Sequence, residues 1–309
     1  MKEVTLKDFV TSFGAENEGI PEECKDLINE KDFKYEILEG LERDRLLLEI
    51  IKKIENDEQI IGAKERQNVW ENGWGENLQD FINSGYDLEM LVPKFIRPNQ
   101  IVRFAQSYIR PSNNSFELDY YSVFRKWLFS VYFRDYENIY EFGCGTGFNL
   151  VVLSQMYPDK KLYGTDFVKS SADLVNEIGK RHNLKLTGSI FDMINPNEEF
   201  KLKEGSLIFT IGSIEQLASK FEAFLQYLLR NKPGLCVHVE PTIELYEENN
   251  LVDYFAIKFH KKRGYTQGFL PRLRELEKSG KVEILKVKRL FFGSLFMEGY
   301  NLIVWRPVK

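Results

Sequence analysis

From about residue 137 onward, the chain alternates short apolar stretches with longer amphipathic ones. The short stretches contain many β-branched and aromatic residues, which is typical of buried strands. These predicted strands lie at 138–143, 161–167, 184–190, 206–213 and 234–240. The stretches with a helical pattern lie at 148–157, 170–183, 215–231 and 244–278. Strands that alternate with helices predict an α/β fold with a doubly wound, mostly parallel sheet.

The last two apolar stretches, 281–292 and 296–308, have no helical stretch between them. Strands joined by a short connection pair antiparallel, because a parallel pair needs a long crossover. We therefore expect an antiparallel C-terminal strand pair at one edge of the sheet. Together with the five strands before it, this pair makes a sheet of seven strands.

The patterns before residue 137 are mostly helical. The stretch 41–57 repeats apolar residues at helical spacing, and 115–133 shows a second, aromatic-rich helical pattern. One or two short extended pieces are expected near 101–109. We therefore divide the chain into an α-helical cap segment, 1–136, and an α/β domain, 137–309.

The composition excludes several classes of protein. A net charge of −5 argues against a general polyanion-binding protein, since such proteins usually present a basic face. The three cysteines are far apart and form neither a disulfide framework nor a zinc-spaced set, so no metal is expected. No apolar run reaches the ~20 residues that a membrane span needs. We expect a cytoplasmic protein with no membrane segment.

Three glycines, Gly143, Gly145 and Gly147, directly follow the first strand of the α/β region. In such sheets ligands lie at the carboxyl ends of the strands, and glycine allows both a close approach and a positive φ there. The loop is not a nucleoside triphosphate loop, because Phe148 and Asn149 stand where that motif needs Lys and Ser or Thr. It also departs from the dinucleotide fingerprint, whose third glycine would fall at Phe148.

The remaining pattern, E-x-G-x-G-x-G from Glu141 to Gly147, resembles the first motif of the class I S-adenosylmethionine-dependent methyltransferases. Two further acids match this family: Asp166 ends the second strand, and Asp192 follows the third. The resemblance covers roughly residues 137–309 and implies a Rossmann-like domain. Each feature alone has a simpler explanation, because the loop could be a tight turn, Asp166 a turn residue and Asp192 a helix cap.

The resemblance implies a role for each of these residues in holding the cofactor S-adenosylmethionine. Gly143 and Gly145 would cradle the methionine part, and Glu141 would help to hold its ammonium group. The Asp166 carboxylate would accept hydrogen bonds from both ribose hydroxyls, while Asp192 and an apolar neighbour would meet the adenine. The expected cofactor-binding residues are Glu141, Gly143, Gly145, Gly147, Asp166, Phe167, Asp192, Met193 and Ile211.

A methyl acceptor is expected beside the cofactor, after the fourth and fifth strands. Methyl transfer mainly needs alignment of the acceptor, and a hydroxyl acceptor usually also needs a general base. Glu215 and Glu240 are candidate bases, with Glu240 favoured because it ends the fifth strand. The alternative for Glu215 is a helix cap, and nearby His238 is at least as consistent with a buried core histidine.

A basic, aromatic segment at 254–269 follows the fifth strand. It is expected either to line a pocket for an anionic acceptor, with His260 as a base and Arg263 and Tyr265 in contact, or to form a solvated helix face. In the cap segment, Tyr108 is a candidate for substrate contact. The paired Trp70 and Trp74 at helical spacing are more typical of packing than of function.

We therefore predict S-adenosylmethionine-dependent methyl transfer to a small or medium-sized acceptor, with O-methylation favoured over N-methylation. The acceptor could be a carbohydrate or a secondary metabolite, and could be anionic. The cap segment is expected to cover the substrate or to form the interface of a homodimer. One alternative is a tRNA or other nucleic-acid methyltransferase, which the net charge disfavours, and another is a non-catalytic cofactor-binding protein.

Overall fold

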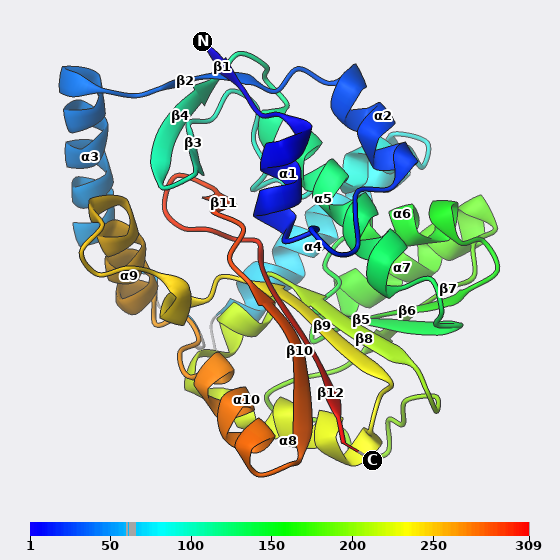
Figure 1. The fold of residues 1–309 in the computed structure, drawn as a ribbon. Coiled ribbons are helices and arrows are strands. Elements are labelled where there is room, and N and C mark those ends of the chain that lie inside the picture. Colours follow the sequence, from blue (N-terminus) through cyan, green and yellow to red (C-terminus); the bar gives the residue numbers. More distant parts are fainter. Residues whose placement is uncertain (60, 62–65, 309) are drawn as a thin grey trace.

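The structure is a computed structural model of the chain that describes residues 1–59, 61 and 66–308 (Figure 1). Its main sheet has seven strands in the order β10-β12-β9-β8-β5-β6-β7. These strands are β5 (Asn138–Phe142), β6 (Lys161–Asp166), β7 (Leu186–Ile190), β8 (Leu207–Ile211), β9 (Leu235–Glu240), β10 (Val282–Lys288) and β12 (Asn301–Pro307). Strands β5 to β9 are parallel, so the predicted doubly wound, mostly parallel sheet is confirmed.

The predicted antiparallel C-terminal pair is also confirmed. Strand β10 pairs antiparallel with β12, and β12 pairs antiparallel with β9. The stretch that was predicted to be helical from 244 to 278 contains two helices, α9 (Leu251–Arg263) and α10 (Phe269–Lys278), with a short loop between them.

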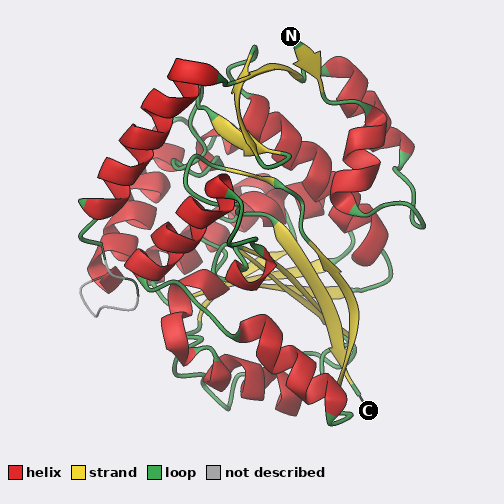
Figure 2. Ribbon diagram, turned by 60° about the vertical axis from the view of Figure 1, so that its left-hand side comes forward, coloured by secondary structure: helices red, strands yellow, loops and turns green. Residues whose placement is uncertain are grey.

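Helices cover both faces of the main sheet, as Figure 2 shows. On one face α6 (Phe148–Met156) and α7 (Lys169–His182) pack in a core with Phe209 of β8 and Val237 of β9. On the other face α8 (Glu222–Asn231) and α10 pack with Ile208 and Cys236, the neighbours of those residues in the two strands. Successive side chains of a strand point to opposite faces, which explains why these central strands are apolar throughout.

The expectation of an α-helical segment at 1–136 is only partly right. This part contains α1 (Leu6–Phe13), α2 (Glu22–Glu30), α3 (Gly40–Glu55), α4 (Arg66–Asn83) and α5 (Phe116–Tyr132). It also contributes β1 (Lys2–Glu3), β2 (Lys34–Ile37), β3 (Val102–Phe104) and β4 (Ser107–Pro111) to a second sheet, whose fifth strand is β11 (Phe292–Gly293). The extended pieces near 101–109 are β3 and β4, whereas β1 and β2 were missed because strands of two to four residues show no periodicity.

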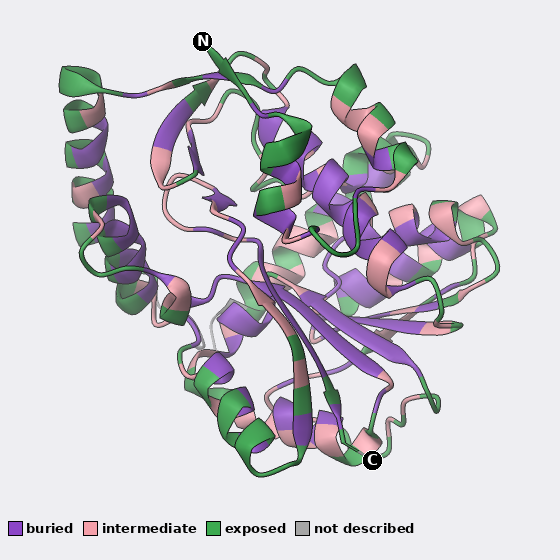
Figure 3. Ribbon diagram, viewed as in Figure 1, coloured by how far each residue is buried: buried purple, intermediate pink, exposed green. Residues whose placement is uncertain are grey.

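The two parts of the chain share one hydrophobic core. Phe9 and Phe13 of α1 and Trp127 of α5 belong to the same buried cluster as Leu150 of α6 and Val304 of β12. Figure 3 shows this continuous buried interior running from the upper helices into the sheet. The division near residue 137 therefore stays a prediction. Among the described residues, no helix combines the length and apolar character that crossing a membrane requires.

Candidate functional site

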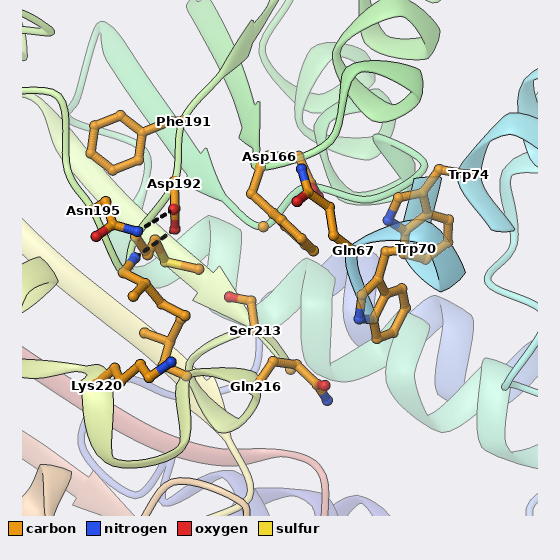
Figure 4. Close-up of a pocket in the computed structure, with 16 residues that line it drawn as sticks. Gln67, Trp70, Trp74, Asp166, Phe191, Asp192, Asn195, Ser213, Gln216 and Lys220 are labelled. Atoms are coloured by element: carbon orange, nitrogen blue, oxygen red, sulfur yellow. Dashed lines mark hydrogen bonds between the residues drawn. The ribbon is translucent and has the colours of Figure 1, made fainter. Parts of the chain in front are cut away.

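A cavity of about 480 Å³ lies at the carboxyl ends of β5, β6, β7 and β8. Sixteen residues line it, and Figure 4 draws them. They are Gln67, Trp70, Trp74, Gly143, Asp166, Phe167, Phe191, Asp192, Met193, Ile194, Asn195, Gly212, Ser213, Gln216, Leu217 and Lys220. The cavity is at the edge of the sheet where an α/β fold is expected to bind its ligand.

The glycine loop reaches the cavity wall at Gly143 and has little room for side chains. Gly143 has a φ of 74°, and a Cβ added to it would lie 2.3 Å from the Cβ of Ser213. Gly145 has a φ of 51°, and a Cβ there would lie 2.9 Å from Cζ2 of Trp74. Gly147 is the N-cap of α6. A Cβ added to Gly147 would meet Val175, which does not line the cavity. Both the conformation and the space at Gly143 and Gly145 therefore require glycine.

Asp166 connects the end of β6 to the glycine loop. Its Oδ2 accepts a hydrogen bond from the backbone N–H of Gly145 at 3.0 Å, and its Oδ1 accepts one from Val168 at 3.4 Å. The side chain lines the cavity although the residue is 4% exposed. This burial raises the pKa of Asp166 to about 6, because a carboxylate loses hydration there.

Asp192 lies across the cavity, after β7. Its Oδ1 accepts a hydrogen bond from the backbone N–H of Ile194, and its Oδ2 accepts one from Nδ2 of Asn195, both at 2.8 Å (Figure 4). Phe191 and Met193 place apolar side chains on either side of it in sequence, and both line the cavity. The structure thus brings Asp192 and Met193 to the same cavity as Gly143, Asp166 and Phe167.

Glu141 lies behind the glycine loop rather than in the cavity wall. It is 1% exposed, and its Oε1 accepts a hydrogen bond from Nδ2 of Asn149 at 2.7 Å. The Oδ1 atom of Asn149 accepts hydrogen bonds from Tyr121 at 2.6 Å and Arg125 at 3.2 Å. Burial raises the pKa of Glu141 to about 8. This buried network fixes the start of α6, and with it the loop.

Ile211, the last residue of β8, is also outside the set of lining residues. It pairs with Val239 of β9, and the next two residues, Gly212 and Ser213, line the cavity instead.

The predicted base Glu240 holds the loop that follows β8. Its Oε1 accepts a hydrogen bond from the N–H of Ser213 at 3.2 Å, and its Oε2 accepts one from the N–H of Glu215 at 3.3 Å. Glu240 is 3% exposed, and burial raises its pKa to about 7. Glu215 is also buried and accepts a hydrogen bond from Gln216. Neither carboxylate is part of the cavity wall.

Both histidines of this region are core residues. The ring of His238 contacts the rings of Phe269 and Trp305, and its Nδ1 is 2.9 Å from the hydroxyl of Thr210. The Nε2–H of His260 donates to the carbonyl oxygen of Thr266 at 2.9 Å. Burial lowers the pKa of His238 to about 3 and that of His260 to about 4, so both stay neutral.

The predicted substrate contacts lie in a separate core between α3 and α9. Arg263 donates through Nε to Asp57 at 2.7 Å and through Nη1 to the hydroxyl of Tyr265 at 3.1 Å. Its guanidinium lies 4.6 Å from the ring centroid of Phe259. Tyr108 is 2% exposed in the same cluster. None of Arg263, Tyr265 and Tyr108 reaches the cavity wall, so their predicted substrate contacts remain predictions.

Helix α4 supplies part of the site that the sequence did not identify. Gln67, Trp70 and Trp74 line the cavity, and the two indole rings stack with centroids 5.4 Å apart. Glu71 fixes this helix to the start of α7, because its Oε1 accepts a hydrogen bond from the N–H of Ser170 at 3.2 Å. The tryptophan spacing was visible in the sequence, but the same spacing is equally typical of two residues that pack in a core.

Metal ligation has no support in the part of the chain that the structure describes. No group of three or more His, Cys, Asp or Glu side chains there could hold a metal ion. The cysteines are all buried and free.

No family model and no curated protein sequence matches this chain. Solved structures do match it. The [4+2]-cyclase SpnF matches with 12% identity and a TM-score of 0.52, over 78% of this chain and 96% of its own. A SAM dependent methyltransferase from Aquifex aeolicus matches with 17% identity and a TM-score of 0.39, over 56% of this chain and 82% of its own. Human N-acetylserotonin methyltransferase, in complex with SAM, matches with 15% identity and a TM-score of 0.40, over 63% of this chain and 56% of its own.

These structural neighbours include several SAM-dependent methyltransferases of the class I fold. At identities this low the likeness concerns the fold alone.

Proposed function

We propose that this chain binds S-adenosylmethionine in the cavity and transfers its methyl group to a small acceptor. The observation that carries the proposal is the meeting of three sequence-distant features at one cavity. These are the glycine at the end of β5, the acid at the end of β6 and the acid after β7, namely Gly143, Asp166 and Asp192. Solved neighbours that carry SAM or its product support the same ligand.

The residues present fit this cofactor. Asp166 has a carboxylate at the wall that can accept hydrogen bonds from two ribose hydroxyls. Phe167 and Met193 provide apolar surface for a flat base, with Asp192 at its edge. Gly143 presents bare backbone at the cavity wall, which the methionine part can approach closely. A pocket with apolar walls and a few polar groups is typical of cofactor sites.

The bound cofactor supplies an activated methyl group, and the chain has to align the acceptor. The lining residues outside the proposed cofactor contacts include Gln67 and Gln216, whose amides can orient an acceptor, and the exposed Lys220. The only carboxylates among the sixteen lining residues are Asp166 and Asp192. We therefore propose an acceptor that needs no protein base, such as an amine or an oxygen that is already ionised. We propose O-methylation of such an oxygen as the leading form of the reaction.

The test is incubation of the protein with methyl-labelled S-adenosylmethionine and pools of small metabolites, followed by mass spectrometry. A labelled small molecule is expected, and a protein with Asp166→Ala should form far less of it. Label that appears only in RNA would instead support the nucleic-acid alternative.

A second candidate is a cofactor-binding protein that does not transfer the methyl group. The observation in its favour is that Glu240, His260 and Glu215 are all buried outside the cavity wall. In addition, one solved neighbour, which covers 78% of this chain, is named a [4+2]-cyclase rather than a methyltransferase. Tight cofactor binding without label transfer to any acceptor pool would favour this candidate.

We also propose a cytoplasmic location. Three cysteines that are free and buried, with no disulfide among the described residues, fit a reducing compartment.

A further inference from the structure

We propose that Trp74 and Trp70 recognise the positive charge of the cofactor's sulfonium, and that they make the cavity prefer S-adenosylmethionine to its neutral product, S-adenosylhomocysteine. This inference rests on the proposed function, because it assumes that the cofactor occupies the cavity. It assigns a specificity role to α4, whose tryptophan spacing is by itself more typical of packing.

A short chain of contacts places the indole rings beside the expected sulfur position. Cζ2 of Trp74 lies 2.9 Å from where a Cβ of Gly145 would be, so the ring rests on the glycine loop. The N–H of Gly145 donates to Oδ2 of Asp166 at 3.0 Å. Trp74 and Asp166, which both line the cavity, are therefore joined through Gly145 at one corner of it.

The connectivity of the cofactor then fixes which of its atoms meets this corner. Its sulfur is bonded to the 5′ carbon of the ribose on one side and to the methionine chain on the other. In the proposed pose Asp166 holds the ribose and Gly143 faces the methionine part. The sulfur that joins these two parts consequently lies next to Gly145 and the ring of Trp74.

The carboxylates around the cavity are engaged elsewhere. Asp192 lies on the side of the cavity opposite to the two tryptophans, where it pairs with Asn195 (Figure 4). Glu71, on the same helix as the tryptophans, accepts hydrogen bonds from the N–H of Ser170. Among the sixteen lining residues, Asp166 is the one carboxylate at this corner, and in the proposed pose it shares its oxygens between Gly145 and the ribose hydroxyls.

Two stacked indole rings are a suitable partner for a cation in such a place. The face of tryptophan attracts a cation more strongly than the faces of other aromatic residues, and the attraction grows when water is excluded. Trp70 and Trp74 are both half-buried and stack at 5.4 Å with an interplanar angle of 27°, so they present a combined aromatic wall. Glu71 and Ser170 hold the helix that carries them against α7.

A charge-dependent contact of this kind has a consequence for turnover. The sulfonium loses its charge when the methyl group leaves, so the aromatic wall holds the cofactor more strongly than the product. Product release is then favoured over product retention. The two ligands differ by one methyl group and one charge. Apolar packing responds to the methyl group and would persist with leucine, whereas an aromatic face also responds to the charge.

The test is isothermal titration of S-adenosylmethionine and S-adenosylhomocysteine into the wild type, Trp74→Leu, Trp70→Leu and Trp74→Phe. Leucine keeps an apolar side chain but removes the π face, whereas phenylalanine keeps a weaker one. Val69→Ala is the matched control, since Val69 is an exposed residue of α4 that does not line the cavity. Circular dichroism of each sample checks that it is folded.

For Trp74→Leu, we expect the ratio of the two dissociation constants to shift against S-adenosylmethionine by about three- to thirty-fold. That shift corresponds to ~0.7–2 kcal/mol at 1.4 kcal/mol per tenfold change. A smaller shift is expected for Trp70→Leu and for Trp74→Phe, and none for Val69→Ala. An unchanged ratio in both leucine variants would overturn the inference while leaving the proposed function intact. A wild type that binds neither ligand would overturn both.

Discussion

The sequence predicts functional residues in two regions of this molecule, and only one of these regions lines a cavity in the structure. At the carboxyl ends of β5, β6 and β7, residues from three separate strands meet at one cavity. Beyond the carboxyl end of β9, the residues expected to bind and activate the acceptor are bonded to other parts of the protein: Glu240, His260 and Tyr265 are buried, and Arg263 is half-buried. Both regions follow strand ends, so strand-end position alone does not identify a site.

The difference lies in where the polar groups find their partners. Asp166 binds the backbone of the glycine loop and still faces the cavity. Arg263 is paired with Asp57 in a half-buried ion pair, and the buried His260 donates to the carbonyl oxygen of Thr266, so both side chains find their partners within the protein. Charged and titratable residues serve both purposes, and the sequence shows the residue without showing its partner.

The largest expected effect comes from filling the glycine loop. Gly143→Val should reduce cofactor affinity by about a hundredfold or more, because its Cβ would meet Ser213 at 2.3 Å and its φ of 74° is unfavourable for a branched residue. Titration calorimetry with circular dichroism on the same sample measures this. Gly299→Ala is the control, since a Cβ there meets nothing within 4 Å. Unchanged affinity in Gly143→Val would show that the glycine loop does not contact the cofactor.

Removing the charge of Asp166 should have the next largest effect. Asp166→Asn should cost about 1.5–3 kcal/mol of cofactor binding, since an amide cannot accept both hydroxyl hydrogen bonds as a carboxylate does.

The pH dependence of binding provides an internal check on Asp166. Burial raises its pKa to about 6, so the ionised form that accepts both hydroxyls becomes dominant as pH rises through 6. Wild-type affinity should therefore increase from pH 5 to pH 7, and Asp166→Asn should lose this increase. The same raised pKa means that this group stabilises the fold less as pH rises from about 4 to about 6. A wild-type affinity that falls with pH over this range would contradict the assignment.

In the second region, substitutions should affect stability rather than binding. Arg263→Ala removes a hydrogen-bonded ion pair with Asp57 and the stacking on Phe259, so we expect a loss of ~1–3 kcal/mol in the free energy of unfolding. Urea unfolding measures it, and cofactor affinity should stay within twofold of the wild type. Lys262 is an exposed neighbour of Arg263, and Lys262→Ala should change neither the free energy of unfolding nor the cofactor affinity by much. A stable Arg263→Ala protein with weakened acceptor binding would instead support the predicted acceptor pocket at residues 254–269.

Glu240→Gln should have the smallest effect on chemistry. The glutamine can still accept one of the two backbone hydrogen bonds that hold the loop after β8, so we expect a stability loss of ~1–2 kcal/mol. Methyl-transfer turnover should fall by less than about tenfold, whereas loss of a general base would lower it by ~10²–10⁴. A loss of that larger size, with both ligands still bound, would show that Glu240 is the base after all.

Much of the main sheet was predictable from the sequence because its strands are apolar, β-branched stretches that alternate with stretches of helical period. All seven strands and the antiparallel pair were found in this way. Strands β1, β2 and β11 were missed because they are two to four residues long and pair with residues distant in sequence. Nothing local distinguishes such strands from a loop.

The residues of the candidate site likewise fall into those that a local pattern predicts and those that depend on long-range contacts. Gly143, Asp166 and Asp192 could be placed at one edge because each follows a strand, and strand ends of a parallel sheet lie together. The contribution of α4 depends on long-range contacts, namely Trp74 on Gly145 and Glu71 on Ser170, which no local pattern encodes. The same limit explains why Arg263 could not be assigned, since Asp57 lies far from it in sequence.

The central claim is that the cavity at the ends of β5 to β8 binds S-adenosylmethionine. The most direct measurement is isothermal titration of the wild-type protein with S-adenosylmethionine and, separately, with NAD, followed by the same titrations of Gly145→Val. We predict one micromolar site for S-adenosylmethionine, no heat with NAD, and loss of the site in the variant, whose side chain would collide with Trp74. Tight NAD binding without cofactor binding, or full affinity for S-adenosylmethionine in Gly145→Val, would contradict the account.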